Sequence, residues 1–205
     1  ELLGLSPSSR DPHAPYVVAN HILKFASLFC NSPCARVNEL DYRTTITDAS
    51  ARAAVERHYD AIENGTRRFL ANMDRREIAV THDFYLKKYQ LSRPRLLYDT
   101  ILFDEGQDAS PVMLDVFLSQ RATRVIVGDI HQQIYGWRYA INSLAKTPFT
   151  TLNLSTSFRF PQDIAGLAMG LLQWKDKLGT YKPISITGMG KTSKPQTKAT
   201  IGRTN

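Results

Sequence analysis

The fold is decided by residues 100–108, which read TILFDEGQD. The first four of them form a short apolar run, too short for a helix and bounded by charge, which predicts a buried strand. Residues 124–127, RVIV, repeat this pattern and predict a second buried strand that ends at Gly128-Asp129. A third strand is expected over residues 150–154, where apolar and polar side chains alternate.

Helices are predicted to alternate with these strands. They are expected after Ser110-Pro111, where proline suits the first helical position, over 139–146, and over 161–178 with one apolar face. This alternation implies a parallel sheet with right-handed crossovers. Ligands of such sheets bind at the carboxyl ends of the strands.

The residues before this sheet are predicted to be mainly helical. After a loose leader over 1–15, helices are expected over 16–29, 48–64, 66–73 and 82–91, with a stop at Asn64-Gly65.

Composition excludes several classes of protein. The chain has 205 residues, of which 42% are hydrophobic, and no apolar run approaches the ~18 residues of a membrane span. The first residues have no basic start followed by an apolar stretch, so a signal peptide is not expected there. Cys30 and Cys34 are the whole thiol inventory, which excludes a disulfide scaffold and supplies too few ligands for zinc. Two reduced cysteines in an intracellular protein are expected.

The net charge of +7 is concentrated near the end of the chain. Residues 171–205 contain seven basic side chains and one acid, Asp176. This segment is either a solvated basic tail or a surface that contacts a phosphate backbone.

Acidic side chains follow both early strands. Asp104-Glu105 come directly after the first strand and Asp129 after the second, so three acids are expected at one edge of the sheet. A nucleotide hydrolase needs such groups opposite its phosphates, an Asp to hold Mg²⁺ and a Glu to orient and deprotonate water.

Three ordered blocks extend this pattern. They are DEGQD at 104–108, VGDIHQQIYGWRYA at 127–140 and LSTSFRF at 154–160. They resemble the DEAQD Walker B, GDxxQxIYxWRGA and LxxNYRS motifs of the UvrD/Rep-like superfamily 1 DNA helicases. The GDxHQQIY and SFRF patterns, together with HDFYLK at 82–87, resemble the F-box DNA helicase branch. The final RTN at 203–205 resembles the start of the second motor domain.

The resemblance implies a role for several residues around a triphosphate. Asp104 would serve Mg²⁺, and Glu105 would act on the attacking water. Gln132 would sense the γ-phosphate, Phe158 would stack on adenine, and Arg159 would be an arginine finger.

The resemblance also implies a DNA-binding loop. Tyr135 and Trp137 would stack on bases of single-stranded DNA, and Arg138 would contribute to coupling or to backbone contact. Because Gln132 lies in the same loop, the nucleotide state would move the residues that grip DNA. Taken alone, without the neighbouring motifs, Tyr135 and Trp137 read more readily as ordinary half-buried aromatics. Tyr139 departs from the family pattern, which has a Gly there.

The largest departure from a P-loop motor is the missing phosphate loop. Residues 1–97 contain no G-x-x-x-x-G-K-[ST] run, and GKT at 190–192 has Ser185 where the first Gly should stand, so a basic loop is expected there. The chain is therefore expected to be a fragment that begins inside motor domain 1, with a degenerate relative as the alternative.

The sequence predicts an α/β fold: a partial parallel-sheet P-loop NTPase (RecA-like) motor domain with a mainly helical N-terminal part. The expected divisions are 1–97, helical; 98–160, the motor core; and 161–205, a helix and basic linker that enters motor domain 2.

The predicted function is that of part of an ATP-dependent 3′–5′ DNA helicase in repair or recombination. ATP and Mg²⁺ are the implied cofactors. Single-stranded DNA, duplex junctions and the remainder of the helicase chain, with its Walker A segment and motor domain 2, are the implied partners. No membrane is expected, and the location is intracellular, nuclear in a eukaryote. The alternatives are an inactive single-stranded DNA-binding relative and a regulatory protein that uses neither site.

Overall fold

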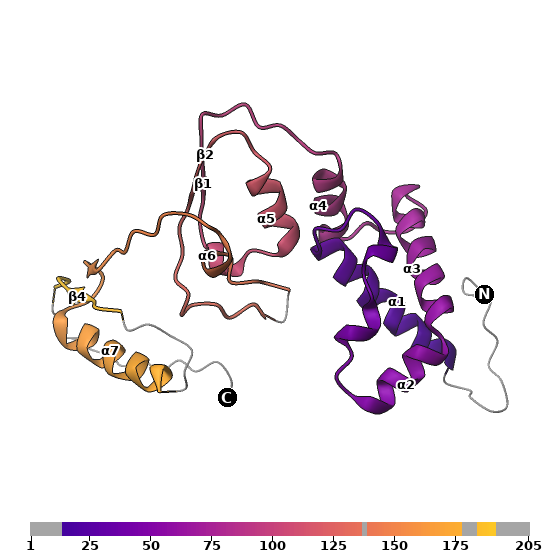
Figure 1. Cartoon of the computed structure of the whole chain (residues 1–205), viewed down its shortest axis with the longest axis horizontal. Helices are drawn as coiled ribbons and strands as arrows, with labels where there is room; N and C mark the ends of the chain where they lie inside the picture. Colours follow the sequence, from indigo (N-terminus) through magenta and orange to yellow (C-terminus); the bar gives the residue numbers. More distant parts are fainter. Residues whose placement is uncertain (1–13, 137–138, 178–183, 192–205) are drawn as a thin grey trace. The chain divides into compact units, whose positions relative to one another are not determined.

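The computed structural model describes residues 14–136, 139–177 and 184–191 (Figure 1). The chain divides into two compact units, residues 1–147 and residues 148–205, and each is described by itself. The elements of the first unit are α1 (Ala14–Asn31), η1 (Val37–Glu39), η2 (Tyr42–Thr45), α2 (Ala49–Arg57), α3 (Tyr59–Asp74), α4 (His82–Leu91), β1 (Thr100–Phe103), η3 (Gly106–Asp108), α5 (Pro111–Leu118), β2 (Thr123–Ile126) and α6 (Ser143–Lys146). None of the helices described is long and apolar enough to cross a membrane.

The core of the first unit forms between α1 and α3. Every third or fourth residue of α1 is buried, which gives the helix one apolar face: Val18, Ile22, Phe25 and Phe29. The ring of Phe25 stacks on that of Tyr42 with centroids 4.9 Å apart. Tyr42 Oη also lies 2.8 Å from His21 Nδ1 in a buried hydrogen bond. Burial raises the pKa of Tyr42 to about 12. The pKa of His21 is lowered, mainly by burial and to a smaller extent by the positive charge of Lys24.

The break between the second and third helices differs from the prediction. Asp48 caps α2 through a hydrogen bond from the Ala51 amide, as expected of an aspartate at this position. However, α2 ends at Arg57, with His58 as its C-cap, rather than at Asn64-Gly65. Gly65 lies buried inside α3. Its neighbour Thr66 is also buried, with Oγ1 3.5 Å from the carbonyl oxygen of Ile22 on α1. The expected stop was wrong because Gly65 lies on the face of α3 that packs against α1.

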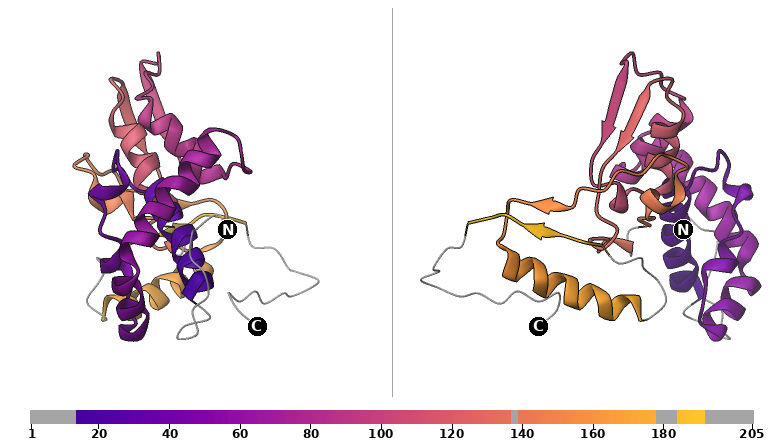
Figure 2. Two further views of the ribbon diagram at one scale, coloured as in Figure 1. Left: turned by 90° about the vertical axis from the view of Figure 1, so that its right-hand side faces the viewer. Right: turned by 60° about the vertical axis from the view of Figure 1, so that its left-hand side comes forward.

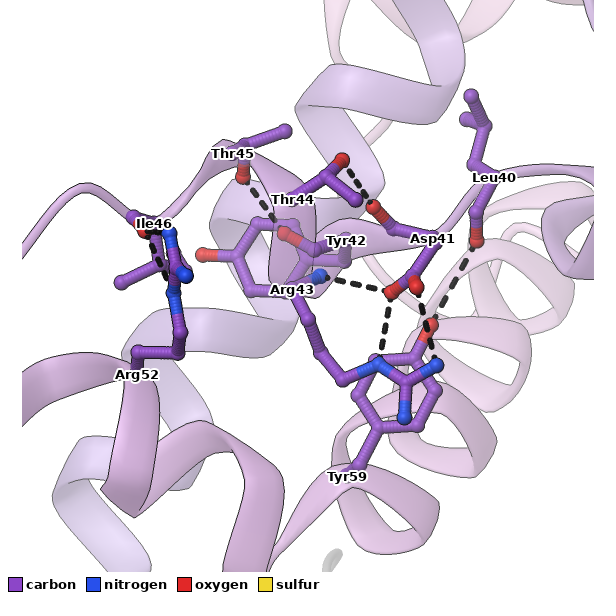
Figure 3. Close-up of polar contacts among 9 residues, drawn as sticks. All are labelled: Leu40, Asp41, Tyr42, Arg43, Thr44, Thr45, Ile46, Arg52 and Tyr59. Atoms are coloured by element: carbon purple, nitrogen blue, oxygen red, sulfur yellow. Dashed lines mark hydrogen bonds and ion pairs between the residues drawn. The ribbon is translucent and has the colours of Figure 1, made fainter. Parts of the chain in front are cut away.

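A polar cluster closes the connection from η2 to α2 and α3 (Figure 3). Arg43 donates from Nε and Nη2 to the two carboxylate oxygens of Asp41, at 2.8 and 2.9 Å, and its guanidinium carbon lies 4.5 Å from the Tyr59 ring centroid. The hydrogen bonds from Arg43 hold the pKa of Asp41 below its usual value. Arg52 donates to the carbonyl of Ile46 at 2.7 and 3.1 Å. These contacts fix a segment that has little regular structure.

Helix α4 joins the helices to the strands of the same unit. Lys87 is 1% exposed; its Nζ donates to the carbonyls of Ser32 (2.8 Å) and Cys34, and lies 4.5 Å from the Phe29 ring centroid. Gln90 donates to the carboxylate of Asp115 on α5 at 2.8 Å. The helix prediction over 82–91 is confirmed residue for residue.

The sheet of the first unit has two parallel strands (Figure 2). Phe103 on β1 stacks on Phe117 of α5 with centroids 5.2 Å apart, so α5 packs against one face. On the other face Leu102 is 72% exposed and lies opposite Val125 in the register. The expectation of buried strands was therefore wrong on this face, in the part of the chain that is described. The predicted parallel pairing is confirmed, in a unit that is mostly helical.

The second unit contains β3 (Thr156–Ser157), α7 (Gln162–Asp176) and β4 (Thr187–Gly188), with β3 and β4 parallel. The strand predicted over residues 150–154 was wrong, because these residues are exposed and pairing begins only at Thr156. Helix α7 confirms the predicted helix, although most of its apolar face is exposed and Leu178 lies outside the described residues.

Gly190 lies against Phe160, where its amide donates to the Phe160 carbonyl at 2.9 Å. A Cβ at Gly190 would lie 2.5 Å from the Phe160 nitrogen, so this glycine serves a close backbone approach. Gly188, two residues earlier, donates to Gln162 Oε1 at 2.8 Å, which ties β4 to the start of α7. Thr192 lies outside the described residues.

Candidate functional site

The two parallel strands bring three acids to one edge of the sheet. Phe103 and Ile126 are register partners at the ends of β1 and β2. Asp104 and Glu105 follow the first strand directly, and Asp129 follows the second by three residues. The predicted placement of the three acids at one sheet edge is confirmed.

Backbone hydrogen bonds hold the two strand ends together beyond the ladder. The amide of Gly106 donates to the carbonyl of Val127 at 2.9 Å, and the amide of Glu105 donates to Asp104 Oδ1 at 2.9 Å. Glu105 itself has a backbone φ of 53°, in the left-handed region that few residues other than Gly adopt. The chain thus turns sharply at Glu105 and leaves the carboxylates of Asp104 and Glu105 exposed.

Gln107 joins the two acidic segments. Its Nε2 donates to Glu105 Oε2 at 2.7 Å, and its Oε1 accepts from the amide of Asp129 at 3.1 Å. Sequence analysis did not assign this residue a role. The available signal was a glutamine two residues after the candidate base, inside the DEGQD block.

The next loop begins with Gln132 beside Asp129. Gln132 Nε2 donates to Asp129 Oδ2 at 2.8 Å, while the His131 amide donates to the other carboxylate oxygen at 2.8 Å. Asp104, Glu105 and Gln132 are therefore linked by an unbroken series of hydrogen bonds through Gln107 and Asp129. Three of the predicted nucleotide-site residues thus belong to one hydrogen-bonded group.

The far end of this loop is hydrogen-bonded just before the start of α5. Gln133 donates to the carbonyl of Ala140 at 3.0 Å, and the Ile141 amide donates to the carbonyl of Ala109 at 2.8 Å. Tyr135 is exposed between these anchors, and Trp137 and Arg138 lie outside the described residues. The helix predicted over residues 139–146 is confined to Ser143–Lys146, because Tyr139 has a φ of 62°.

Phe158 and Arg159 lie in the second unit. They follow β3 directly, and the amide of Arg159 donates to Ser157 Oγ at 3.3 Å. Both side chains are exposed, as a stacking ring and a phosphate-binding cation would need to be. Their convergence with Asp104 and Glu105 stays a prediction.

The donors at the sheet edge suit Mg²⁺ but do not by themselves enclose an ion. Among the residues described, no three His, Cys, Asp or Glu side chains are grouped so as to hold a metal. Mg²⁺ is commonly held by one or two carboxylates together with substrate phosphates, and the exposed oxygens of Asp104 fit that mode. Cys30 is buried, and burial raises the pKa of its thiol to about 12, which makes it an inert core residue.

The sequence of this chain is similar to those of two F-box DNA helicases. F-box DNA helicase 1 of Gallus gallus is 46% identical over 99 residues, which are 47% of this chain and 10% of that protein. F-box DNA helicase protein 1 of Schizosaccharomyces pombe is 39% identical over 114 residues, 52% of this chain and 13% of that protein. The chain thus spans about a tenth of the length of these curated relatives. No solved structure matches it.

A family model, that of the UvrD/REP helicase N-terminal domain, matches residues 20–147. These residues include both strands of the first sheet, the acids at their carboxyl ends and the loop that contains Gln132. The match covers more than half of the sequence, and the chain therefore belongs to the UvrD/REP helicase N-terminal domain family.

Proposed function

We propose that this chain is part of an ATP-dependent DNA helicase that moves 3′ to 5′ along single-stranded DNA and unwinds duplex junctions during repair or recombination. The observation that supports this most directly is the hydrogen-bonded series from Glu105 through Gln107 and Asp129 to Gln132. It connects a candidate catalytic base to a loop that also contains an exposed aromatic residue. A motor needs this kind of connection between hydrolysis and DNA contact.

Asp104 and Glu105 would divide the chemistry of hydrolysis between them. When Mg²⁺ is bound, it neutralises charge on the phosphates, and Asp104 would be its protein ligand. Glu105 would take a proton from water as the water oxygen attacks the γ-phosphorus and the bond to the β-phosphate oxygen breaks. The products are ADP and phosphate.

Gln132 would report the state of the nucleotide. An amide can donate to a γ-phosphate oxygen or accept from the attacking water, and Gln132 now donates to Asp129. A change of partner at Gln132 would move the loop that contains Tyr135. Tyr135 and Trp137 would each stack on a base, an interaction worth about 1–3 kcal/mol per base, with Arg138 on the DNA backbone.

The second unit would complete the nucleotide site. Arg159 would stabilise the charge that develops on the transferring phosphoryl group, and Phe158 would stack on adenine. The remainder of the helicase would provide the phosphate-binding loop and motor domain 2. The basic residues of 171–205 would contact the DNA backbone, in the nucleus of a eukaryote.

Replacement of Glu105 by Gln tests the function directly. In the protein encoded by the complete reading frame, Glu105→Gln should lower DNA-stimulated ATP hydrolysis by about 10²–10⁴-fold, because only the base is removed. Nucleotide binding, measured with a fluorescent ATP analogue, should persist. Glu56→Gln, the same change at an exposed position on α2, is the matched control and should hydrolyse ATP normally. Full turnover by Glu105→Gln would exclude this mechanism.

A second candidate is an inactive helicase relative that only holds single-stranded DNA. The exposed ring of Tyr135 and the basic residues of 171–205 would suit such a protein. Assays on the protein encoded by the complete reading frame distinguish the helicase from the binding protein. A protein that binds oligonucleotides but releases no phosphate from ATP would be the binding protein.

A further inference from the structure

We propose that Gln107 is a positioning residue, whose buried amide fixes the carboxylate of Glu105 and ties it to the segment that leads into the Gln132 loop. The proposal rests on the proposed helicase function, in which Glu105 is the base. It adds a residue to which the sequence comparison gives no role. It also assigns the link between the two acidic segments to one side chain.

The orientation of the Gln107 amide is settled by its two shorter hydrogen bonds, to Glu105 and Asp129. The amide of Asp129 can only donate, so the atom that faces it at 3.1 Å must be the carbonyl oxygen of Gln107. The carboxylate of Glu105 can only accept, so the atom at 2.7 Å must be the nitrogen. Rotation of the amide by half a turn would break both hydrogen bonds. With 1% exposure, Gln107 also has almost no water with which to replace them.

The absence of a side chain at Gly128 leaves room for the Gln107 amide. A Cβ at Gly128 would lie 2.4 Å from Gln107 Oε1 and 3.0 Å from the backbone nitrogen of Gly106. Both distances are shorter than ordinary packing allows, so any larger residue would push the amide or the turn away. The glycine therefore serves close approach, and the seat of Gln107 is built from backbone on both strands.

Glu105 needs such support because its carboxylate is exposed at the end of a flexible side chain. An exposed glutamate samples several rotamers, whereas a general base must meet its proton within hydrogen-bonding distance. The hydrogen bond from Gln107 to Glu105 Oε2 restricts the rotamers of Glu105. Glu105 Oε1 would then face the attacking water. The fixed geometry predicts an effect on turnover rather than on nucleotide affinity.

Gln107→Glu is the sharpest test, because it keeps the oxygen that accepts from Asp129 and replaces the nitrogen that donates to Glu105 at 2.7 Å and, at a longer 3.4 Å, to Asp108 Oδ2. In the complete protein, kcat for DNA-stimulated ATP hydrolysis should fall about 10–100-fold, as when groups that orient a reacting ligand are removed. KM for ATP and affinity for a single-stranded oligonucleotide should change less than about threefold, since neither contact is lost. Gly128→Ala should lower kcat in the same direction by displacing the amide.

Gln120→Glu is the matched control. Gln120 is also a buried glutamine with both ends bonded, donating to the carbonyl of Pro94 at 3.1 Å and accepting from the amide of Leu96 at 2.9 Å. It lies outside the acidic edge, so its variant should lower the melting temperature but leave kcat unchanged. If Gln107→Glu does not fold, Gln107→Met and Gln120→Met replace the pair. A loss of kcat at Gln107 no larger than at Gln120 overturns the proposal.

Glu105→Gln, measured alongside, separates this inference from the proposed function. If Glu105→Gln hydrolyses ATP normally, or if the wild-type protein hydrolyses none, the helicase mechanism fails and the role of Gln107 fails with it. If Glu105→Gln is inactive while Gln107→Glu turns over like wild type, only the positioning role is refuted.

Discussion

Tyr139 occupies a backbone conformation that suits glycine. Its φ of 62° lies in the left-handed region, which costs most residues roughly 1–2 kcal/mol. The half-buried side chain reaches back to α1, where its hydroxyl lies 3.5 Å from the carbonyl of Lys24. The related helicase motif has Gly at this point, and the backbone explains why. Tyr139 therefore holds the end of the Gln132 loop at some conformational cost.

Two substitutions of similar size test this strain. Tyr139→Asn and Tyr139→Val both remove the ring and its contact with Lys24, but Asn tolerates a positive φ and a β-branched residue does not. The free energy of unfolding of Tyr139→Val should be about 1 kcal/mol lower than that of Tyr139→Asn, because valine bears the cost of the left-handed conformation. Urea unfolding followed by circular dichroism measures it. Equal stability of the two variants would argue against strain at this position.

The acids of the site could be predicted from the sequence, but Gln107 could not. Asp104 and Glu105 follow an apolar run directly, so a parallel sheet places them at its edge whatever the rest of the fold. The role of Gln107 depends on the approach of Gly128 from the second strand, a contact between residues 21 positions apart. A single sequence gives no sign of such a pairing. Arg159 depends on the second unit, and its role stays a prediction.

At the scale of elements, periodic segments were predicted well and isolated signals poorly. Helices α1 and α4 have regular apolar spacing, and their predicted ranges agree with the structure within two residues at each end. Gly65 misled because a glycine can end a helix or let two helices meet, and local sequence does not distinguish these. The alternation over residues 150–154 found no partner strand among the described residues. Pairing, rather than propensity, decides whether such a segment becomes a strand.

Substitutions on the face of α1 that packs on α3 should lower the free energy of unfolding more than substitutions elsewhere on this helix. Phe25→Ala removes a fully buried ring stacked on Tyr42 and should lower the free energy of unfolding by about 3–5 kcal/mol. Leu23→Ala, two residues away on the same helix, removes a side chain that is 53% exposed and should cost about 0.5 kcal/mol or less. Chemical denaturation of both variants measures the difference. A Phe25→Ala protein as stable as Leu23→Ala would contradict the assigned core.

At the scale of the whole molecule, the first sheet is covered on one face by α5 and open on the other. Leu102 and Val125 are register partners on the open face, and both are exposed. Apolar strands of parallel sheets are normally covered on both faces. If the proposed function holds, the rest of the protein encoded by the complete reading frame is expected to cover Leu102 and Val125.

Leu102→Asp distinguishes a covered face from an open one. In the 205-residue chain the change should alter the free energy of unfolding by about 0.5 kcal/mol or less, because the site is exposed. In the complete protein it should cost several kcal/mol, because an unpaired charge would be buried. Thermal unfolding of both proteins gives the comparison, with Leu97→Asp, outside the sheet, as control. Equal small effects in both proteins would show that the face stays open.

The side-chain hydrogen bonds of Lys87 and Gln90 on α4 also have a mechanical consequence. Residues 92–99 join α4 to β1 as an irregular segment. In addition, Lys87 on α4 bonds to the carbonyls of Ser32 and Cys34 after α1, and Gln90 on α4 bonds to Asp115 on α5. Side chains as well as backbone thus tether the helices to the strands. A force that separates the helices from the strands would therefore act on these side-chain hydrogen bonds as well as on the backbone of residues 92–99.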